Sequence, residues 1–159
     1  MNEILDQLKT IFSAAFSTTF STYYKGKIEI PAQSNMPILS IYPVRTEQRH
    51  TGTVRDTVAY EIAIEAIYSM KQFLDNTNTS NDESDALEQL MKIVEERETD
   101  GDLKTSTIMG ILNANITVGD KVLYTQSMKV DYLPYFVAGE FPACKATVTF
   151  EASDRPNRT

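Results

Sequence analysis

The chain has 159 residues, 42% of them hydrophobic, which is enough for one domain of ordinary size that buries about 70% of its unfolded surface. It carries 22 acidic and 15 basic side chains, and the net charge of -7 argues against a dedicated binder of nucleic acid or anionic membranes, since both need a basic face. Cys144 is the only cysteine, so the sequence excludes an internal disulfide and a cysteine-based zinc cluster.

The first predicted element is an amphipathic helix from residue 2 to about residue 20. Its apolar residues follow the i, i+3, i+4, i+7 spacing of a helix with one buried face, and they are Ile4, Leu5, Leu8, Ile11, Phe12, Ala15 and Phe16. Asn2 is the expected N-cap. Residues 11–20 are too rich in Ser and Thr to span a bilayer, and residues 1–9 lack the basic segment of a signal peptide. We therefore expect a protein that is made and used in a cytoplasm.

A short strand is expected at residues 27–30, followed by an antiparallel pair of strands. Pro37 and Pro43 flank the segment Ile38–Tyr42, which confines it to a sheet edge or limits its pairing, because proline donates no backbone hydrogen bond. The segment Thr53–Tyr68 has apolar side chains at even positions, which is the period of a half-buried strand. The polar residues 45–53 are predicted to form a projecting hairpin loop between the two.

The segment Thr53–Tyr68 is long for a chain of this size. At about 3.3 Å per residue it would span roughly 50 Å, whereas a compact domain of this length is only about 40 Å across. The strand must therefore bend, carry a bulge or project. We expect Val58–Ile64 to form its core part and its ends to bend away or reach a neighbouring subunit.

A second helix is predicted from residue 82 to residue 98, after a polar loop at 76–84. Ser80 and Glu83 fit a capping box at its start. A one-sided apolar stripe follows, made of Leu87, Leu90, Met91 and Val94. The charged face opposite this stripe is expected to be solvated.

Three strands are predicted in the last third of the chain. A strand at 108–118 is expected to turn at Gly119 and Asp120 into a return strand at 121–132. Residues 133–142 hold two prolines and a glycine, so they are predicted to form an exposed aromatic loop. Regular alternation then indicates a last strand at 143–152.

These elements predict a single α+β domain at residues 1–152, in which two helices pack on one face of a largely antiparallel mixed sheet. Residues 153–159 are predicted to be a polar C-terminal tail.

The sequence offers few groups for catalysis. His50 is the only histidine, so a metal site would have to consist mainly of carboxylates. Cys144 lies on the inward side of the last predicted strand and is expected to fill the core. The scattered glycines form no phosphate-binding loop. We expect no catalytic, cofactor-binding or metal-binding residues. The alternative is a small ligand-binding or hydrolytic protein that uses His50 and a pocket near Cys144 under the aromatic loop.

Glu61 and Glu65 lie on the outward side of the long strand, with Ala59 and Ala63 beside them. A solvated face is one explanation for these acidic side chains. The other is a stripe that lines an interior or meets a basic partner.

The order of the elements resembles that of the tail terminator proteins of long-tailed bacteriophages, which are also called tail completion or tail-to-head joining proteins. The resemblance lies in the helix ILDQLKTIF, the strands ILSIYPV and TVRDTVAYEIAIEAIY with the loop RTEQRHTG between them, the helix ALEQLMKIV and the closing strand CKATVTFEA. It covers most of the chain and concerns pattern and length.

The resemblance implies a non-enzymatic virion protein, without a cofactor, that forms a ring of expected hexameric size. This ring would cap the tail tube and join it to the head connector or stopper protein, in the tail and neck of a virion assembled in the host cytoplasm. DNA would pass through without specific binding, and no membrane would be contacted. On this hypothesis Glu61 and Glu65 face the channel. Subunit or tube contacts are assigned to Arg45, Arg49, Tyr132, Tyr135, Phe136 and Phe141.

Overall fold

The computed structural model describes residues 1–29, 31–50, 56–70, 83–122 and 124–154. The elements follow one another in the order α1 (Asn2–Ala15), β1 (Thr22–Lys25), the short 3-10 helix η1 (Gln33–Asn35), β2 (Ile38–His50), β3 (Asp56–Ser69), α2 (Glu83–Glu95), α3 (Ile108–Ala114), β4 (Tyr124–Ala138) and β5 (Phe141–Asp154).

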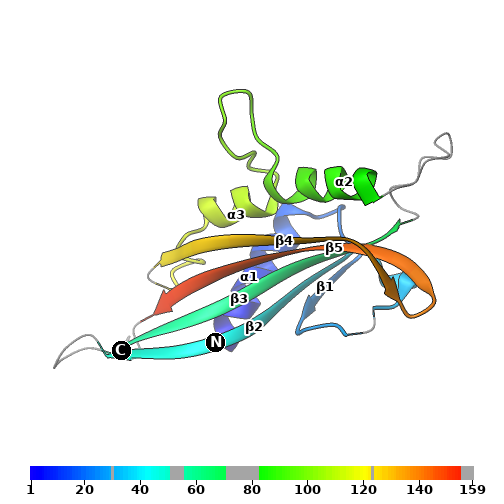
Figure 1. Cartoon of the computed structure of the whole chain (residues 1–159). Helices are drawn as coiled ribbons and strands as arrows, with labels where there is room; N and C mark the ends of the chain where they lie inside the picture. Colours follow the sequence, from blue (N-terminus) through cyan, green and yellow to red (C-terminus); the bar gives the residue numbers. More distant parts are fainter. Residues whose placement is uncertain (30, 51–55, 71–82, 123, 155–159) are drawn as a thin grey trace.

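The strands form one sheet in the order β1-β2-β3-β5-β4 (Figure 1). β1 pairs with β2 in parallel, and the other three pairings are antiparallel. The predicted α+β class with a largely antiparallel mixed sheet is therefore confirmed. The predicted pairing of the two long strands is also confirmed, because Ile41 of β2 lies opposite Ile64 of β3.

The main core lies between the sheet and the helices. Even-numbered residues of β3, such as Ile62 and Ile64, point towards this helix-side face and are fully buried against Leu8 and Phe12 of α1 and Leu90 of α2. Figure 1 shows α1 behind the sheet, and α2 and α3 above β4. Three α-helices, rather than the two predicted, thus belong to the described fold.

The opposite face of the sheet, which we call the open face, is covered at one end. Residues 26–29 and 31–36 lie over it there, where Ser40 donates a hydrogen bond to the carbonyl of Gly26 and Gln33 Nε2 donates one to Ser69 Oγ at 3.4 Å. Because the helices cover the other face of the sheet, every residue from 62 to 70 is buried. The buried part of β3 therefore lies further along the chain than the predicted core segment Val58–Ile64.

The predicted strand at 108–118 is wrong, and so is its hairpin with residues 121–132. Residues 108–114 form α3, capped by Thr107, whose side-chain oxygen accepts a hydrogen bond from the backbone N–H of Gly110 at 3.1 Å. The buried residues Ile108, Ile111 and Leu112 follow the i, i+3, i+4 spacing of a helix. A helix buries these three side chains together, whereas the predicted strand rested on apolar residues at even positions.

The predicted aromatic loop at 133–142 is also wrong, because β4 continues to Ala138 and β5 begins at Phe141. A bulge between Leu133 and Phe136 accommodates Pro134 on this edge strand. Gly139, with φ of 67°, makes the tight turn. Ser153 and Asp154, predicted as the start of a tail, belong to β5, and residues 155–159 lie outside the described residues.

Most of the predicted loop at 45–53 is strand. β2 carries a bulge between Pro43 and Arg45 and then runs on to His50, while residues 51–55 lie outside the described residues. We call Val44–His50 of β2 together with Asp56–Glu61 of β3 the arm.

Three smaller predictions differ from the structure or fall outside it. Asn2 is the first helical residue rather than the N-cap, and α1 ends at Ala15. The first strand is Thr22–Lys25 instead of residues 27–30. The predicted capping residue Ser80 lies outside the described residues.

Candidate functional site

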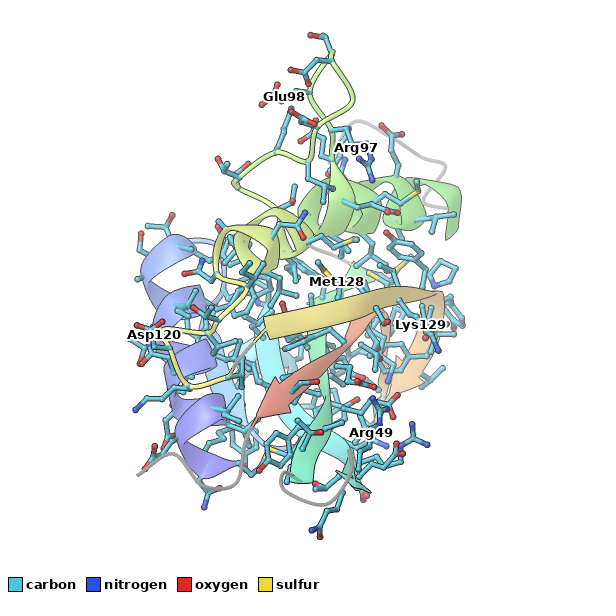
Figure 2. The ribbon with its side chains drawn as sticks, turned by 90° about the vertical axis from the view of Figure 1, so that its left-hand side faces the viewer. Arg49, Arg97, Glu98, Asp120, Met128 and Lys129 are labelled. Atoms are coloured by element: carbon cyan, nitrogen blue, oxygen red, sulfur yellow. The ribbon has the colours of Figure 1, made fainter. Side chains whose placement is uncertain are left out.

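The arm carries a network of charges across β2, β3 and β5. Arg45 Nε lies 3.2 Å from Glu61 Oε2. Arg49 donates to both carboxylate oxygens of Glu151 at 2.9 and 3.0 Å, and to Glu47 at 3.3 Å. The hydrogen bond from Arg49 lowers the pKa of Glu47, and the same contact, with those to Glu151, raises the pKa of Arg49. These residues are paired on the open face of the sheet, where Figure 2 labels Arg49.

Glu65 lies in the middle of the open face and is only 2% exposed. Its Oε2 atom accepts hydrogen bonds from Tyr42 at 3.2 Å and from Lys145 and Thr147 at 3.3 Å each. Burial, followed by the charge of Glu65, raises the pKa of Tyr42 to about 12. Glu65 thus lies on the side of β3 away from the helices, as predicted, but its burial in the described chain contradicts the expected channel-facing position. Glu61, whose side chain is 30% exposed, is the member of the pair at the surface.

The far end of β4 and β5, residues 133–143, exposes apolar side chains, and we call it the hairpin end. Leu133, Tyr135 and Val137 are 42%, 46% and 61% exposed. Phe136 and Phe141 are half-buried against a small apolar cluster on the open face, formed with Met36, Ile38, Ile67, Ala138 and Ala143. The Lys145 amino group lies 5.4 Å from the centre of the Phe136 ring. Large apolar side chains exposed together in this way indicate a contact surface.

The six predicted interface residues fall into three places. Arg45 and Arg49 are on the arm, whereas Tyr135, Phe136 and Phe141 are at the hairpin end. Tyr132 faces α2 instead, where its hydroxyl donates to Glu95 Oε1 at 2.5 Å, and its pKa is raised by burial and by this bond. Tyr132 is therefore engaged inside the subunit.

The arm and the hairpin end lie at opposite ends of the sheet. Arg49 is opposite Thr57 of β3, while Phe136 is opposite Ala143, which is opposite Ser69. At about 3.3 Å per residue, the steps from residue 57 to residue 69 separate them by roughly 40 Å. Figure 1 shows the hairpin end on the right and the arm on the lower left. The two surfaces cannot meet within one chain.

The sheet also separates His50 from Cys144. His50 pairs with Asp56 at one end of β3, and Cys144 pairs with Tyr68 at the other end. The Cys144 side chain is fully buried, and burial raises the pKa of its thiol to about 12. A nucleophilic thiol activated by His50 is therefore contradicted, and the expected core role of Cys144 is confirmed.

A pocket of about 340 Å³ lies beside β1 and is lined by residues that include Tyr24, Lys27, Glu29 and Asn35. Neither His50 nor Cys144 lines it, so it is not the pocket predicted near Cys144. Among the described residues, no cluster of His, Cys, Asp and Glu side chains could hold a metal ion. No described helix has the length and apolar character needed to cross a membrane.

Two contributors to these surfaces escaped the sequence reasoning. Val44 is 53% exposed at the β2 bulge, and Val137 is the most exposed large apolar residue of the described chain. Val44 follows the predicted strand segment Ile38–Tyr42, and Val137 lies in the predicted exposed loop at 133–142, but neither is among the six predicted interface residues. The proline next to Val44 and the glycine after Val137 were the available signals, because such residues often mark bulges and turns.

Models of known protein families do not match this sequence, and no curated protein matches it either.

Proposed function

We propose that the protein is a non-enzymatic structural subunit that forms a ring, expected hexameric, at the end of a bacteriophage tail tube. In this role it caps the tube and joins it to the head connector or stopper protein in the tail and neck of the virion. Assembly would take place in the host cytoplasm, and no membrane would be involved.

The observation that carries the proposal is the presence of two different surfaces at opposite ends of one long sheet. The arm is charged, with Arg45 65% exposed in its side chain, and the hairpin end is apolar, with Val137 61% exposed. A ring requires such a heterologous contact, in which one patch of each subunit meets a different patch of the next. The element order that resembles tail terminators adds to this support.

The charge of the chain suits a ring through which DNA passes. Its net charge of -7 disfavours binding of the DNA phosphates, which depends on many basic contacts. Glu47 and Glu61 on the arm, and Glu151 on the neighbouring strand β5, are candidates for the acidic lining.

Native mass spectrometry of the purified chain tests the proposal, both alone and mixed with a phage tail-tube protein. We expect a closed oligomer, alone or in the mixture, and none induced by serum albumin as a control protein. A monomer that persists at all concentrations in both samples would contradict the ring.

A further inference from the structure

The hairpin end carries an acidic side chain beside its apolar residues. Glu140 lies in the turn between β4 and β5, is exposed, and forms no ion pair with any described residue. Tyr135 and Val137 of β4 are close to it in the chain and are 46% and 61% exposed. This end therefore combines an exposed carboxylate with an apolar surface.

The arm carries the complementary groups. Arg45 contacts Glu61 through Nε, and its side chain remains 65% exposed, so within the described chain its two terminal nitrogens are unengaged. A guanidinium can bind a second carboxylate through these nitrogens in a bidentate geometry. The neighbouring Val44, 53% exposed at the bulge, offers an apolar contact next to this free donor pair.

We propose that the hairpin end of one copy binds the arm of the next copy, with Glu140 on Arg45 and with Tyr135 and Val137 packed over Val44. The inference rests on the proposed ring and states which surfaces meet in it. The partner is a second copy of this chain because each chain holds both complementary halves where they cannot satisfy each other. Arg45 lies opposite Glu61 of β3 and the hairpin end begins opposite Ser69, which at about 3.3 Å per residue is roughly 26 Å further along the sheet. Contact between unlike ends of identical subunits closes into a ring when the rotation permits.

Charge reversal tests this contact in the full chain. Arg45→Glu and Glu140→Arg should each weaken self-association by about tenfold or more, because each places like charges against one another. The double variant, Arg45→Glu with Glu140→Arg, should recover most of the wild-type association. An equal mixture of the two single variants should recover it too, because alternating copies then pair opposite charges at every contact. Sedimentation velocity over a series of concentrations measures these effects.

Glu98→Arg is the matched control for Glu140→Arg, since it makes the same change of charge. Glu98 lies on the connection between α2 and α3, far from Arg49 on the arm (Figure 2). It should leave association unchanged. Thermal unfolding of each variant shows whether Arg45→Glu also disturbs the subunit through Glu61. If the wild-type chain forms oligomers and both single variants form them equally well, this contact is overturned while the ring proposal stands. A wild-type chain that remains monomeric with the tube protein as well would contradict both proposals.

Discussion

At the scale of single residues, the carboxylate of Glu65 is the charged group that the sheet buries most completely among the described residues. All three of its hydrogen-bond donors, on Tyr42, Lys145 and Thr147, reach the same oxygen. The other oxygen, Oε1, is buried without a hydrogen-bond partner in the described chain. Such an arrangement is costly to break, because removal of one partner leaves the other charge without compensation.

We predict that Glu65→Ala lowers the free energy of unfolding by about 2–4 kcal/mol, somewhat less than is usual for fully buried pairs because Lys145 stays 27% exposed and can rehydrate. The matched variant Glu61→Ala should cost less than about 1 kcal/mol, since Glu61 and Arg45 form a solvent-accessible pair in which the side chains are 30% and 65% exposed. Urea unfolding followed by circular dichroism measures both. Equal losses in the two variants would show that the burial of Glu65 contributes nothing.

At the scale of elements, α3 depends on a close approach between Gly110 and the preceding loop. A Cβ atom at position 110 would lie 2.0 Å from the carbonyl oxygen of Lys104, a backbone atom that cannot move aside cheaply. Alanine favours a helix over glycine by roughly 1 kcal/mol, but this steric conflict should outweigh that gain.

Gly110→Ala should therefore destabilise the protein, by about 1–3 kcal/mol. Asn113→Ala is the control, because Asn113 is an exposed position of the same helix and should be neutral or slightly stabilising. Differential scanning calorimetry of the two variants gives the comparison. A Gly110→Ala variant as stable as the wild type would mean that the loop at Lys104 yields freely.

The sequence predicted those elements whose pattern has one structural explanation. Alternation over residues 53–68 identified the long strand and its partner, because no helical stripe fits those positions. The apolar residues of 108–114 fit both the two-residue period of a strand and the 3.6-residue period of a helix. The helix forms because it packs the apolar side chains against α2. Pro134 predicts a break in the strand, but in the structure it lies at a bulge of an edge strand, where its missing backbone N–H breaks no ladder hydrogen bond.

The candidate site was predictable only in part, for the same kind of reason. The surface positions of Arg45, Tyr135 and Glu61 could be predicted from the residues next to them in the chain, and all three side chains are accessible in the structure. The burial of Glu65 depends on residues 26–29 and 31–36 folding over the open face, and on Lys145 reaching it from β5. Such long-range contacts leave no local pattern in the chain.

At the scale of the whole molecule, the fold favours the neutral, protonated forms of several tyrosine hydroxyls and of the cysteine thiol. Burial, then the charge of Glu65, raises the pKa of Tyr42 from 10.0 to about 12, and burial raises that of Cys144 from 9.0 to about 12. Burial also raises the pKa of Tyr68 and, together with Glu95, that of Tyr132. Since the folded protein binds these protons more tightly than the unfolded chain, their contribution to stability is complete below about pH 9.

We therefore predict that the urea midpoint of unfolding falls progressively between pH 9 and pH 12, as the unfolded chain loses protons that the folded one retains. Tyr42→Phe should make this decline shallower above pH 10, because it removes one of the groups that titrate differently in the two states. Asn113→Ala, at an exposed position of α3, removes no titratable group, so it is the control and should leave the decline unchanged. A midpoint that stays constant up to pH 12 would show that the folded and unfolded states bind these protons equally. The pKa values of the buried groups would then be the same in both states.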